Sequence, residues 1–258
     1  MSSLIKGLVP IVDCDSIVYR CGLADKTQTE PLEHTLYSVK QTLNGILDNF
    51  ERKDEAQIYI QGGGNYRNLV ATIQQYKGNR DPSKRPIYFD EIRTYLMEYH
   101  GAVLVNRMET DDAVSIVLRR NPDEHCCISI DKDLDGTPGW HYNFNKQLLY
   151  EVSPEDADFF FWTQVLTGDS GDNIRGLPKV GPKTAQKILQ PHYGSWVDLH
   201  NRAKQEYINR GYETDFHETA TLLFIQREPW INYDGSRLDG KKESCEESSV
   251  STEESITA

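Results

Sequence analysis

The sequence predicts an α/β fold with a mainly parallel central sheet flanked by helices, followed by a smaller helical lobe. Short apolar runs typical of buried strands alternate with amphipathic helical segments, which is the pattern of parallel sheets. After Glu155 the strand signal fades while helical segments continue. A chain of 258 residues with 38% hydrophobic residues is long enough for one large or two modest cores.

The first expected strand is the apolar run at residues 8–13, which ends in Asp13. An amphipathic helix is expected after Pro31, because apolar residues from Leu32 to Phe50 recur at spacings of three and four. Further strands are expected at 57–61, 102–105 and 126–130, with a helix at 110–120. The later helices are expected around 156–166, 182–189 and 214–227. Strands that alternate with helices in this way predict the parallel sheet.

These elements divide the chain into three expected regions: a sheet domain at 1–153, a helical lobe at 154–238 and an acidic tail at 239–258. The tail has six acids, two bases and no aromatic residue, so it cannot bury enough apolar surface to become ordered. We therefore expect it to be disordered.

The composition excludes several classes of protein. No apolar run approaches the ~20 residues of a membrane-spanning helix, and the N-terminus lacks the pattern of a secretory signal. We expect a cytoplasmic protein. The five cysteines include no CxxC pair, which argues against a disulfide framework or a metal-thiolate site. We expect free thiols that lie mostly in the core.

The net charge of −12 argues at first against a nucleic-acid partner. However, nine acids fall in four short clusters, at 13–15, 109–112, 131–133 and 169–172, and residues 1–238 without those nine carry a charge of +1. Bases outnumber acids by six to three at 67–93 and by four to none at 173–187. The sequence therefore predicts a carboxylate centre flanked by two basic patches.

The acidic clusters indicate a site for divalent metal ions. Asp13 and Asp131 directly follow two expected strands, and parallel sheets bind ligands at the carboxyl ends of their strands. Hydrolysis of a phosphodiester needs metal ions that screen the phosphate and activate water, and carboxylates are the ligands that Mg²⁺ prefers. One cluster alone is weak support, because a helix N-terminus attracts acids in any case. Four clusters favour a metal site.

A second motif, GDNIRGLPKVGPKTAQKIL at 171–189, is a turn rich in Gly and Pro followed by a basic helix. Lys179, Lys183 and Lys187 recur every four residues and are suited to phosphate contacts along a DNA backbone. A solvated helix surface shows the same pattern, so both interpretations stay open.

The third motif is YRNLVATIQQYKGNR at 66–80. On a helix, Lys77 and Arg80 form one cationic face beside Tyr76, which suits a single strand or a scissile phosphate. Taken alone, a solvated face explains this motif better.

In order and spacing, ETDDAVS, SIDKDLDG and GDSGDNIRGLPKVGPKTAQKIL resemble the acidic motifs and the helix-hairpin motif of the 5′ nuclease superfamily. That family includes bacteriophage 5′-3′ exonucleases, the 5′ nuclease domains of bacterial DNA polymerase I, and flap endonucleases. YKGNR resembles the family segment at the base of a helical arch through which single-stranded DNA passes. The resemblance covers about residues 9–190, and it implies a nuclease domain at 1–153 with the arch at about 62–100.

The resemblance also implies roles for individual residues. The ligands of a first metal ion would be Asp13, Glu109, Asp111, Asp112 and Asp131. The ligands of a second would be Asp133, Asp169 and Asp172. The catalytic bases at the scissile phosphate would be Lys77 and Arg80. The DNA-binding residues would be Arg67, Tyr76, Arg175, Gly176, Lys179, Val180, Gly181, Lys183 and Lys187, most of them in a helix-three-turn-helix motif that also binds K⁺ in relatives.

The chain departs from the family pattern at one place. Relatives carry an aspartate just after the second strand, where this chain has Gln61 and Gly62. The first metal ion would then be bound more weakly, or through an amide oxygen or water. Asp15 is an extra acid that could compensate, although a helix-capping or surface role is favoured for it.

The resemblance implies a Mg²⁺-dependent 5′-3′ exonuclease with flap endonuclease activity, in which Mn²⁺ can substitute, acting in phage-type DNA replication or recombination. Its expected partner is DNA with a 5′ end, a flap or a nick, or an RNA-DNA hybrid, with no membrane and a monomeric protein. An alternative is a catalytically weak or inactive DNA-binding accessory protein of the same fold. A PIN-type ribonuclease is disfavoured, because that class lacks the hairpin.

Overall fold

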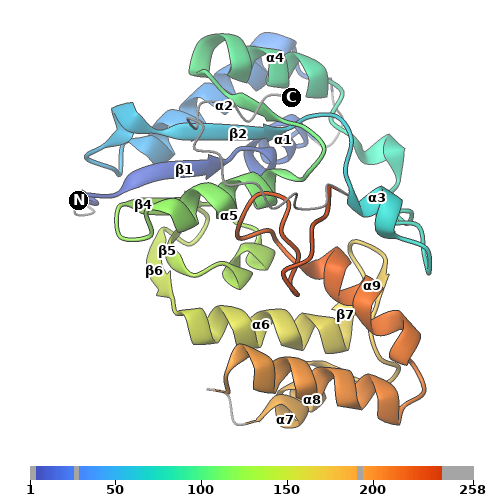
Figure 1. Cartoon of the computed structure of the whole chain (residues 1–258). Coiled ribbons are helices and arrows are strands. Elements are labelled where there is room, and N and C mark those ends of the chain that lie inside the picture. Colours follow the sequence, from blue (N-terminus) through green and yellow to red (C-terminus); the bar gives the residue numbers. More distant parts are fainter. Residues whose placement is uncertain (1–3, 26–28, 191–193, 240–258) are drawn as a thin grey trace, which may run out of the picture.

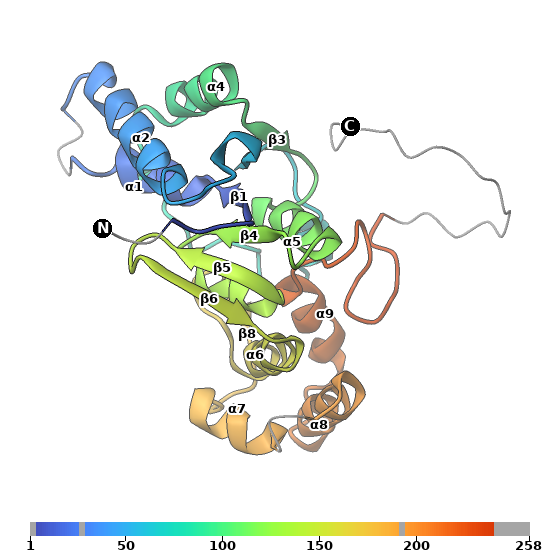
Figure 2. The ribbon, with the colours of Figure 1, turned by 90° about the vertical axis from the view of Figure 1, so that its left-hand side faces the viewer.

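The computed structural model describes residues 4–25, 29–190 and 194–239. Its centre is a six-stranded sheet in the order β3-β2-β1-β4-β5-β6 (Figure 1). The strands are β1 (Val9–Asp13), β2 (Gln57–Gln61), β3 (Val103–Val105), β4 (His125–Ile128), β5 (Gly139–Asn143) and β6 (Leu148–Val152). All neighbours are parallel except β5 and β6, which form an antiparallel pair at one edge (Figure 2). The predicted α/β class and the four predicted strands are confirmed; β5 and β6 were not foreseen.

Helices cover both faces of the sheet. The helices α1 (Asp15–Gly22), α2 (Leu32–Leu47) and α4 (Phe89–His100) pack on one face, and α5 (Thr110–Arg120) packs on the other. Side chains along β1 alternate between the two cores, with Val12 in the first and Ile11 in the second, as the pleat of a strand requires. The cysteines in the described residues are free and buried, as predicted; Cys245 lies outside the described residues.

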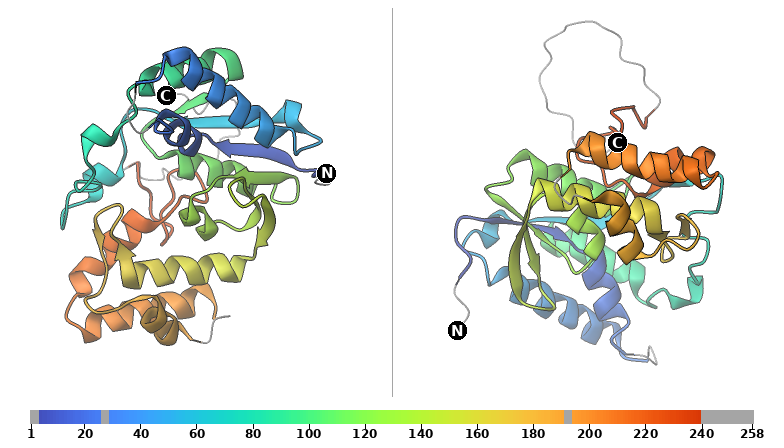
Figure 3. Two further views of the ribbon diagram at one scale, coloured as in Figure 1. Left: turned by 180° about the vertical axis from the view of Figure 1, so that it is seen from behind. Right: turned by 90° about the horizontal axis from the view of Figure 1, so that it is seen from below.

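A helical lobe follows the sheet, and its own aromatic core contains Phe161, Trp162 and Phe216. Its elements are α6 (Pro154–Thr167), β7 (Gly168–Asp169), β8 (Ile174–Arg175), α7 (Pro182–Leu189), α8 (Trp196–Asn209) and α9 (Glu213–Leu223). The chain after α9 passes between the lobe and the sheet domain (Figure 3). The predicted tail at 239–258 lies, apart from Asp239, outside the described residues.

The expected helical arch at 62–100 is not found. After the short helix α3 (Arg67–Val70), residues 71–81 contain no helix and form a turn at 76–79, a short 3₁₀ helix follows at Pro82–Lys84, and α4 begins only at Phe89. Lys77 has a φ of 54°, in the left-handed region that a continuous helix cannot contain. Ile92 and Leu96 of α4 are fully buried against the sheet domain, so this helix is part of its core. No described helix is long and apolar enough to cross a membrane.

Candidate active site

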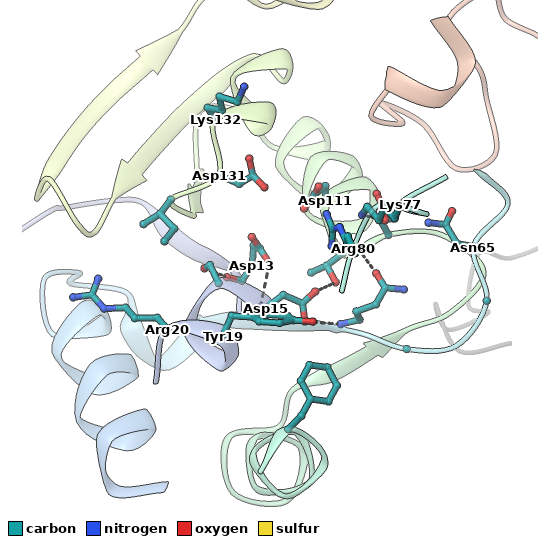
Figure 4. A pocket seen from close by; sticks show the side chains of 18 of the residues that line it. Asp13, Asp15, Tyr19, Arg20, Asn65, Lys77, Arg80, Asp111, Asp131 and Lys132 are labelled. Atoms are coloured by element: carbon teal, nitrogen blue, oxygen red, sulfur yellow. Dashed lines mark hydrogen bonds and ion pairs between the residues drawn. The ribbon is translucent and has the colours of Figure 1, made fainter. Parts of the chain in front are cut away.

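An open cavity of about 890 Å³ lies at the carboxyl end of the parallel strands (Figure 4). Its walls come from the ends of β1, β2 and β4, the start of α5, and the turn that contains Lys77 and Arg80. Five acids line the cavity: Asp13, Asp15, Glu109, Asp111 and Asp131. The sheet topology thus gathers acids that lie up to 118 positions apart in the sequence.

Asp13 lies at the centre of this group and is only 3% exposed. It accepts a hydrogen bond from the hydroxyl of Ser129 at 2.9 Å and one from the backbone N–H of Asp15 at 3.2 Å. Burial, followed by repulsion from Asp15, raises the pKa of Asp13 to about 7. Burial and repulsion from Asp13 and Glu109 also raise the pKa of Asp111 well above its usual range. The negative charges of these carboxylates are therefore not balanced by the positive charges and hydrogen-bond donors around them.

A second group of acids lies beside the first, where the helical lobe meets the sheet domain. Asp133 accepts a hydrogen bond from the side chain of Gln164 at 2.7 Å. Burial, followed by repulsion from Asp131 and Asp169, raises the pKa of Asp133 to about 7. Asp169 accepts a hydrogen bond from the backbone N–H of Gly171 at 2.7 Å. Asp131 therefore lies between the two predicted groups of metal ligands.

These acids fit a divalent cation by their chemistry. Carboxylate oxygens are the donors that Mg²⁺ prefers, and the repulsion that raises their pKa values is what a bound cation relieves. Among the described residues, no three Asp, Glu, His or Cys side chains already form a preassembled metal site.

The two predicted catalytic bases are ion-paired with two of the acids. Lys77 contacts Glu109 and lies 3.5 Å from Asp172, and Arg80 lies 2.6 Å from Asp172. The hydroxyl of Tyr76 is 2.8 Å from Glu109 and 2.9 Å from Asp172. This arrangement brings together the turn at 76–80, the start of α5 and the helical lobe. The predicted DNA contact of Tyr76 is not available in this structure, because its ring is buried in the core of the lobe.

The structure contradicts the roles predicted for Arg67 and Asp112. Arg67 is 2% exposed and Asp112 is 0% exposed, and both oxygens of Asp112 accept hydrogen bonds from the Arg67 guanidinium, at 2.6 and 2.9 Å. Arg67 also donates to the carbonyl oxygens of Leu222 and Phe224. Arg67 cannot reach DNA, and Asp112 has no free oxygen directed at the cavity. The pair is structural.

The predicted hairpin lies between α6 and α7. Gly168 and Gly176 cross so closely that a Cβ on either would lie 2.2 Å from the backbone nitrogen of the other, so only glycine fits. Gly176 thus shapes the turn, and Val180 is buried in the core of the lobe, which contradicts its predicted DNA contact. The other predicted residues are exposed, and Arg175 pairs with Asp215 at 2.7 Å. The exposed residues are Arg175, Lys179, Gly181, Lys183 and Lys187.

Asp15, Gln61 and Thr110 line the cavity although none of them was among the predicted site residues. Asp15 is the first residue of α1, Gln61 ends β2, and Thr110 is the first residue of α5. The sequence shows Asp15 two residues after Asp13, and Gln61 at the end of an expected strand. It does not show that the backbone N–H of Gln61 donates a hydrogen bond to Asp15. The amide oxygen of Gln61 accepts a hydrogen bond from the backbone N–H of Thr110 at 3.1 Å.

The chain is similar in sequence to known nucleases. No known family profile matches the chain. The 5′-3′ exonuclease of Buchnera aphidicola is 28% identical over 174 residues, which cover 60% of this chain and 59% of that protein. The flap endonuclease Xni of Shewanella halifaxensis is 25% identical over 198 residues, which cover 70% of this chain and 76% of that protein. The chain thus spans less than two thirds of the Buchnera exonuclease.

The solved flap endonuclease of bacteriophage T5, in a pseudo-enzyme-product complex with DNA and metal ions, has a TM-score of 0.62 and 18% identity to this chain. The match covers 90% of this chain and 95% of the T5 chain. At this identity the likeness shows a common fold. The chain is thus similar in sequence to a 5′-3′ exonuclease and a flap endonuclease, and similar in fold to a solved flap endonuclease.

Proposed function

We propose that this protein hydrolyses phosphodiester bonds of DNA from the 5′ end, as a 5′-3′ exonuclease with flap endonuclease activity. One observation carries the proposal: a single cavity gathers five acids at the carboxyl ends of the strands and sets Lys77 and Arg80 at its rim. Acids alone would suit a metal-binding protein, and bases alone would suit a DNA-binding protein. Their combination suits metal-dependent cleavage of a phosphodiester.

The acids would hold two Mg²⁺ ions, for which Mn²⁺ can substitute. The first ion would be held by Asp13, Glu109, Asp111 and Asp131, and the second by Asp133, Asp169 and Asp172. When bound, such ions lower the pKa of water and neutralise charge on the phosphate. Asp131 contributes at the boundary of the two groups, where it raises the pKa of both Asp13 and Asp133.

The bases at the rim would orient the scissile phosphate. Lys77 and Arg80 are paired with Glu109 and Asp172, the same acids that the proposal assigns to the metal ions. With a cation held by these acids, Lys77 and Arg80 would be less strongly attracted to Glu109 and Asp172 and could contact a phosphate oxygen. A positive charge held at that position stabilises the charge that develops during hydrolysis.

The lobe would hold the duplex part of the substrate. Lys179, Lys183 and Lys187 are exposed and, among the described residues, form no ion pair. Such lysines contact phosphates and position a duplex without reading its sequence. The turn before α7 would act as the hairpin of a helix-three-turn-helix motif, with K⁺ bound at its backbone. The substrates would be DNA with a 5′ end, flap or nick, or an RNA-DNA hybrid, and the protein would act as a monomer.

A second candidate function is that of a DNA-binding accessory protein that does not cut. The observation in its favour is that Gln61, whose side chain bonds to Met108 and Thr110, stands where a carboxylate would strengthen the metal site. The acids that line the cavity favour the nuclease over this alternative.

One gel assay tests the proposal. The protein is incubated with a 5′-labelled flap, a nicked duplex and an RNA-primed duplex, with Mg²⁺, with Mn²⁺ or with a chelator. We expect cleavage at the 5′ strand with either metal and none with the chelator. Asp131→Asn serves as the control against a contaminating nuclease. Binding of all three substrates without cleavage by the wild type would establish the accessory function instead.

A further inference from the structure

Asp15 joins three elements at the floor of the cavity. One oxygen of its carboxylate accepts the backbone N–H of Gln61 at 3.1 Å, at the end of β2. The other accepts the hydroxyl of Thr110 at 2.6 Å, at the start of α5. The backbone N–H of Asp15 donates to Asp13 at 3.2 Å. Figure 4 shows Asp15 with these contacts dashed, next to Asp13.

The side chain of Gln61 completes the connection. Its amide oxygen accepts the backbone N–H of Thr110 at 3.1 Å, and its amide nitrogen donates to the carbonyl oxygen of Met108 at 3.0 Å. These two bonds hold the backbone on either side of Glu109. The guanidinium of Arg93, in α4, donates a hydrogen bond to the backbone carbonyl oxygen of Gln61. The backbone that carries Glu109 and Asp111 is therefore fixed from β2 and from α1.

We infer that Asp15, Gln61 and Thr110, here called the Asp15 cluster, are positioning residues that set Glu109 and Asp111 relative to Asp13. The inference rests on the proposed function, in which those three acids hold the first metal ion. The two carboxylate oxygens of Asp15 contact Gln61 and Thr110, so Asp15 acts on Glu109 and Asp111 through these two residues. Thr110 is only 2% exposed, so its hydroxyl contact with Asp15 is well shielded from solvent.

The cluster also explains how the chain accommodates an amide at the end of β2. An aspartate at this place could not donate a hydrogen bond to the carbonyl oxygen of Met108, whereas the Gln61 amide does. A negative charge is instead supplied by Asp15, the first residue of α1, which follows the adjacent strand β1. Buried polar groups of this kind hold a fixed geometry only when every member is bonded, so loss of one hydroxyl loosens the whole connection.

The test removes the Thr110 hydroxyl while keeping its shape. Thr110→Val deletes the donor to Asp15, Thr110→Ser keeps it, and Thr221→Val removes a buried hydroxyl from α9 as the matched control. Mn²⁺ affinity is measured by electron paramagnetic resonance without DNA, and kcat and KM are measured on a flap substrate. We expect Thr110→Val to weaken Mn²⁺ binding about 3- to 10-fold and to lower kcat about 10-fold, with KM unchanged. Thr110→Ser should restore both values to within about 2-fold.

Equal Mn²⁺ affinity in Thr110→Val and the wild type would overturn the inference. So would an equal loss of Mn²⁺ affinity in Thr221→Val, because general destabilisation would then be the cause. The Mn²⁺ measurement needs no hydrolysis, so it still tests the Asp15 cluster if the wild type fails to cut DNA. Asp15→Asn provides a second variant: it keeps the shape but not the charge, and we expect it to weaken Mn²⁺ binding in the same direction as Thr110→Val.

Discussion

Two sets of ion pairs in this molecule have the same chemistry and different surroundings. Arg67–Asp112 and Lys77–Glu109 both join the segment at 67–80 to the start of α5. The first pair is excluded from solvent, and its arginine is further satisfied by two backbone carbonyls. The Lys77 side chain is 26% exposed at the edge of the cavity, and its neighbour Arg80 is 56% exposed.

The difference shows what separates a structural pair from a functional one. A buried ion pair is tolerable only when every hydrogen-bonding group is satisfied, so Arg67 and Asp112 have no capacity left for a ligand. The pairs at the cavity can exchange partners, because solvent and an incoming cation or phosphate can reach them. The predictions below test whether these two sets of pairs have separate roles.

The largest effect is expected for the buried pair. Arg67→Ala leaves the buried Asp112 carboxylate without its charged partner, and we expect the free energy of unfolding to fall by about 3–5 kcal/mol. Urea denaturation measures this. Arg80→Ala is the matched control at the exposed pair and should change stability by less than about 1 kcal/mol. Equal midpoints for the two variants would remove the distinction between the pairs.

The next effect concerns the acids of the cavity and the lobe. Asp131→Asn or Asp169→Asn removes a proposed metal ligand and no phosphate contact, so hydrolysis should fall by about 10²-fold or more while binding of a flap substrate persists. Single-turnover cleavage and a gel-shift titration measure the two quantities. If binding fell as much as cleavage, the assignment of these acids to metal ions would be wrong.

The free energy of unfolding of the metal-free protein is expected to fall by on the order of 2 kcal/mol between pH 5 and pH 8. Burial and repulsion from Asp15 raise the pKa of Asp13 to about 7, from a value near 4 in the unfolded chain. The folded state binds this proton more tightly, so stability is highest below pH 4 with respect to this group. It falls as the pH rises toward 7 and then levels off.

Thermal unfolding at pH 5 and pH 8 in a chelator tests this. We expect Mg²⁺ to raise the melting temperature more at pH 8 than at pH 5, because the cation relieves the repulsion among ionised acids. Asp13→Asn should reduce the difference in melting temperature between the two pH values, and the remainder is expected from Asp111 and Asp133. Equal melting temperatures of the metal-free protein at pH 5 and pH 8 would contradict the repulsion between Asp13 and its neighbouring acids.

A smaller effect is expected at the exposed bases. Lys77→Ala and Arg80→Ala should each lower the single-turnover rate about 10-fold and change DNA affinity less, because their charge acts where negative charge develops in the transition state. Rapid-quench measurements at saturating enzyme separate the rate from the affinity. A rise in the dissociation constant alone would mean that these bases only hold DNA.

The smallest effect is expected in the helical lobe. Lys179→Ala and Lys183→Ala should weaken binding uniformly across sequences, and each should reduce the slope of log affinity against log salt by about 1. Fluorescence anisotropy over a series of salt concentrations measures the slope. An unchanged slope would identify these lysines as solvated side chains without a phosphate partner.

The sequence by itself determined the α/β class and the place of the acids. Strands β1 to β4 follow from short apolar runs, because a strand that is buried on both faces needs apolar residues throughout. Asp13 and Asp131 line the cavity because Asp13 ends β1 and Asp131 lies three residues after β4, and the ends of parallel strands meet at one edge. These are local patterns combined with a general rule of topology.

The tertiary structure decided which charges are available. Arg67 and Lys77 are indistinguishable as bases in the sequence, yet one is buried by the chain around Leu222 and the other is open to the cavity. The expected helix through Tyr76 gave way to a turn, in which the backbone N–H of Lys77 donates to the carbonyl oxygen of Asp172. Contacts between residues so far apart in the chain arise only when the lobe packs on the sheet domain, so local periodicity cannot reveal them.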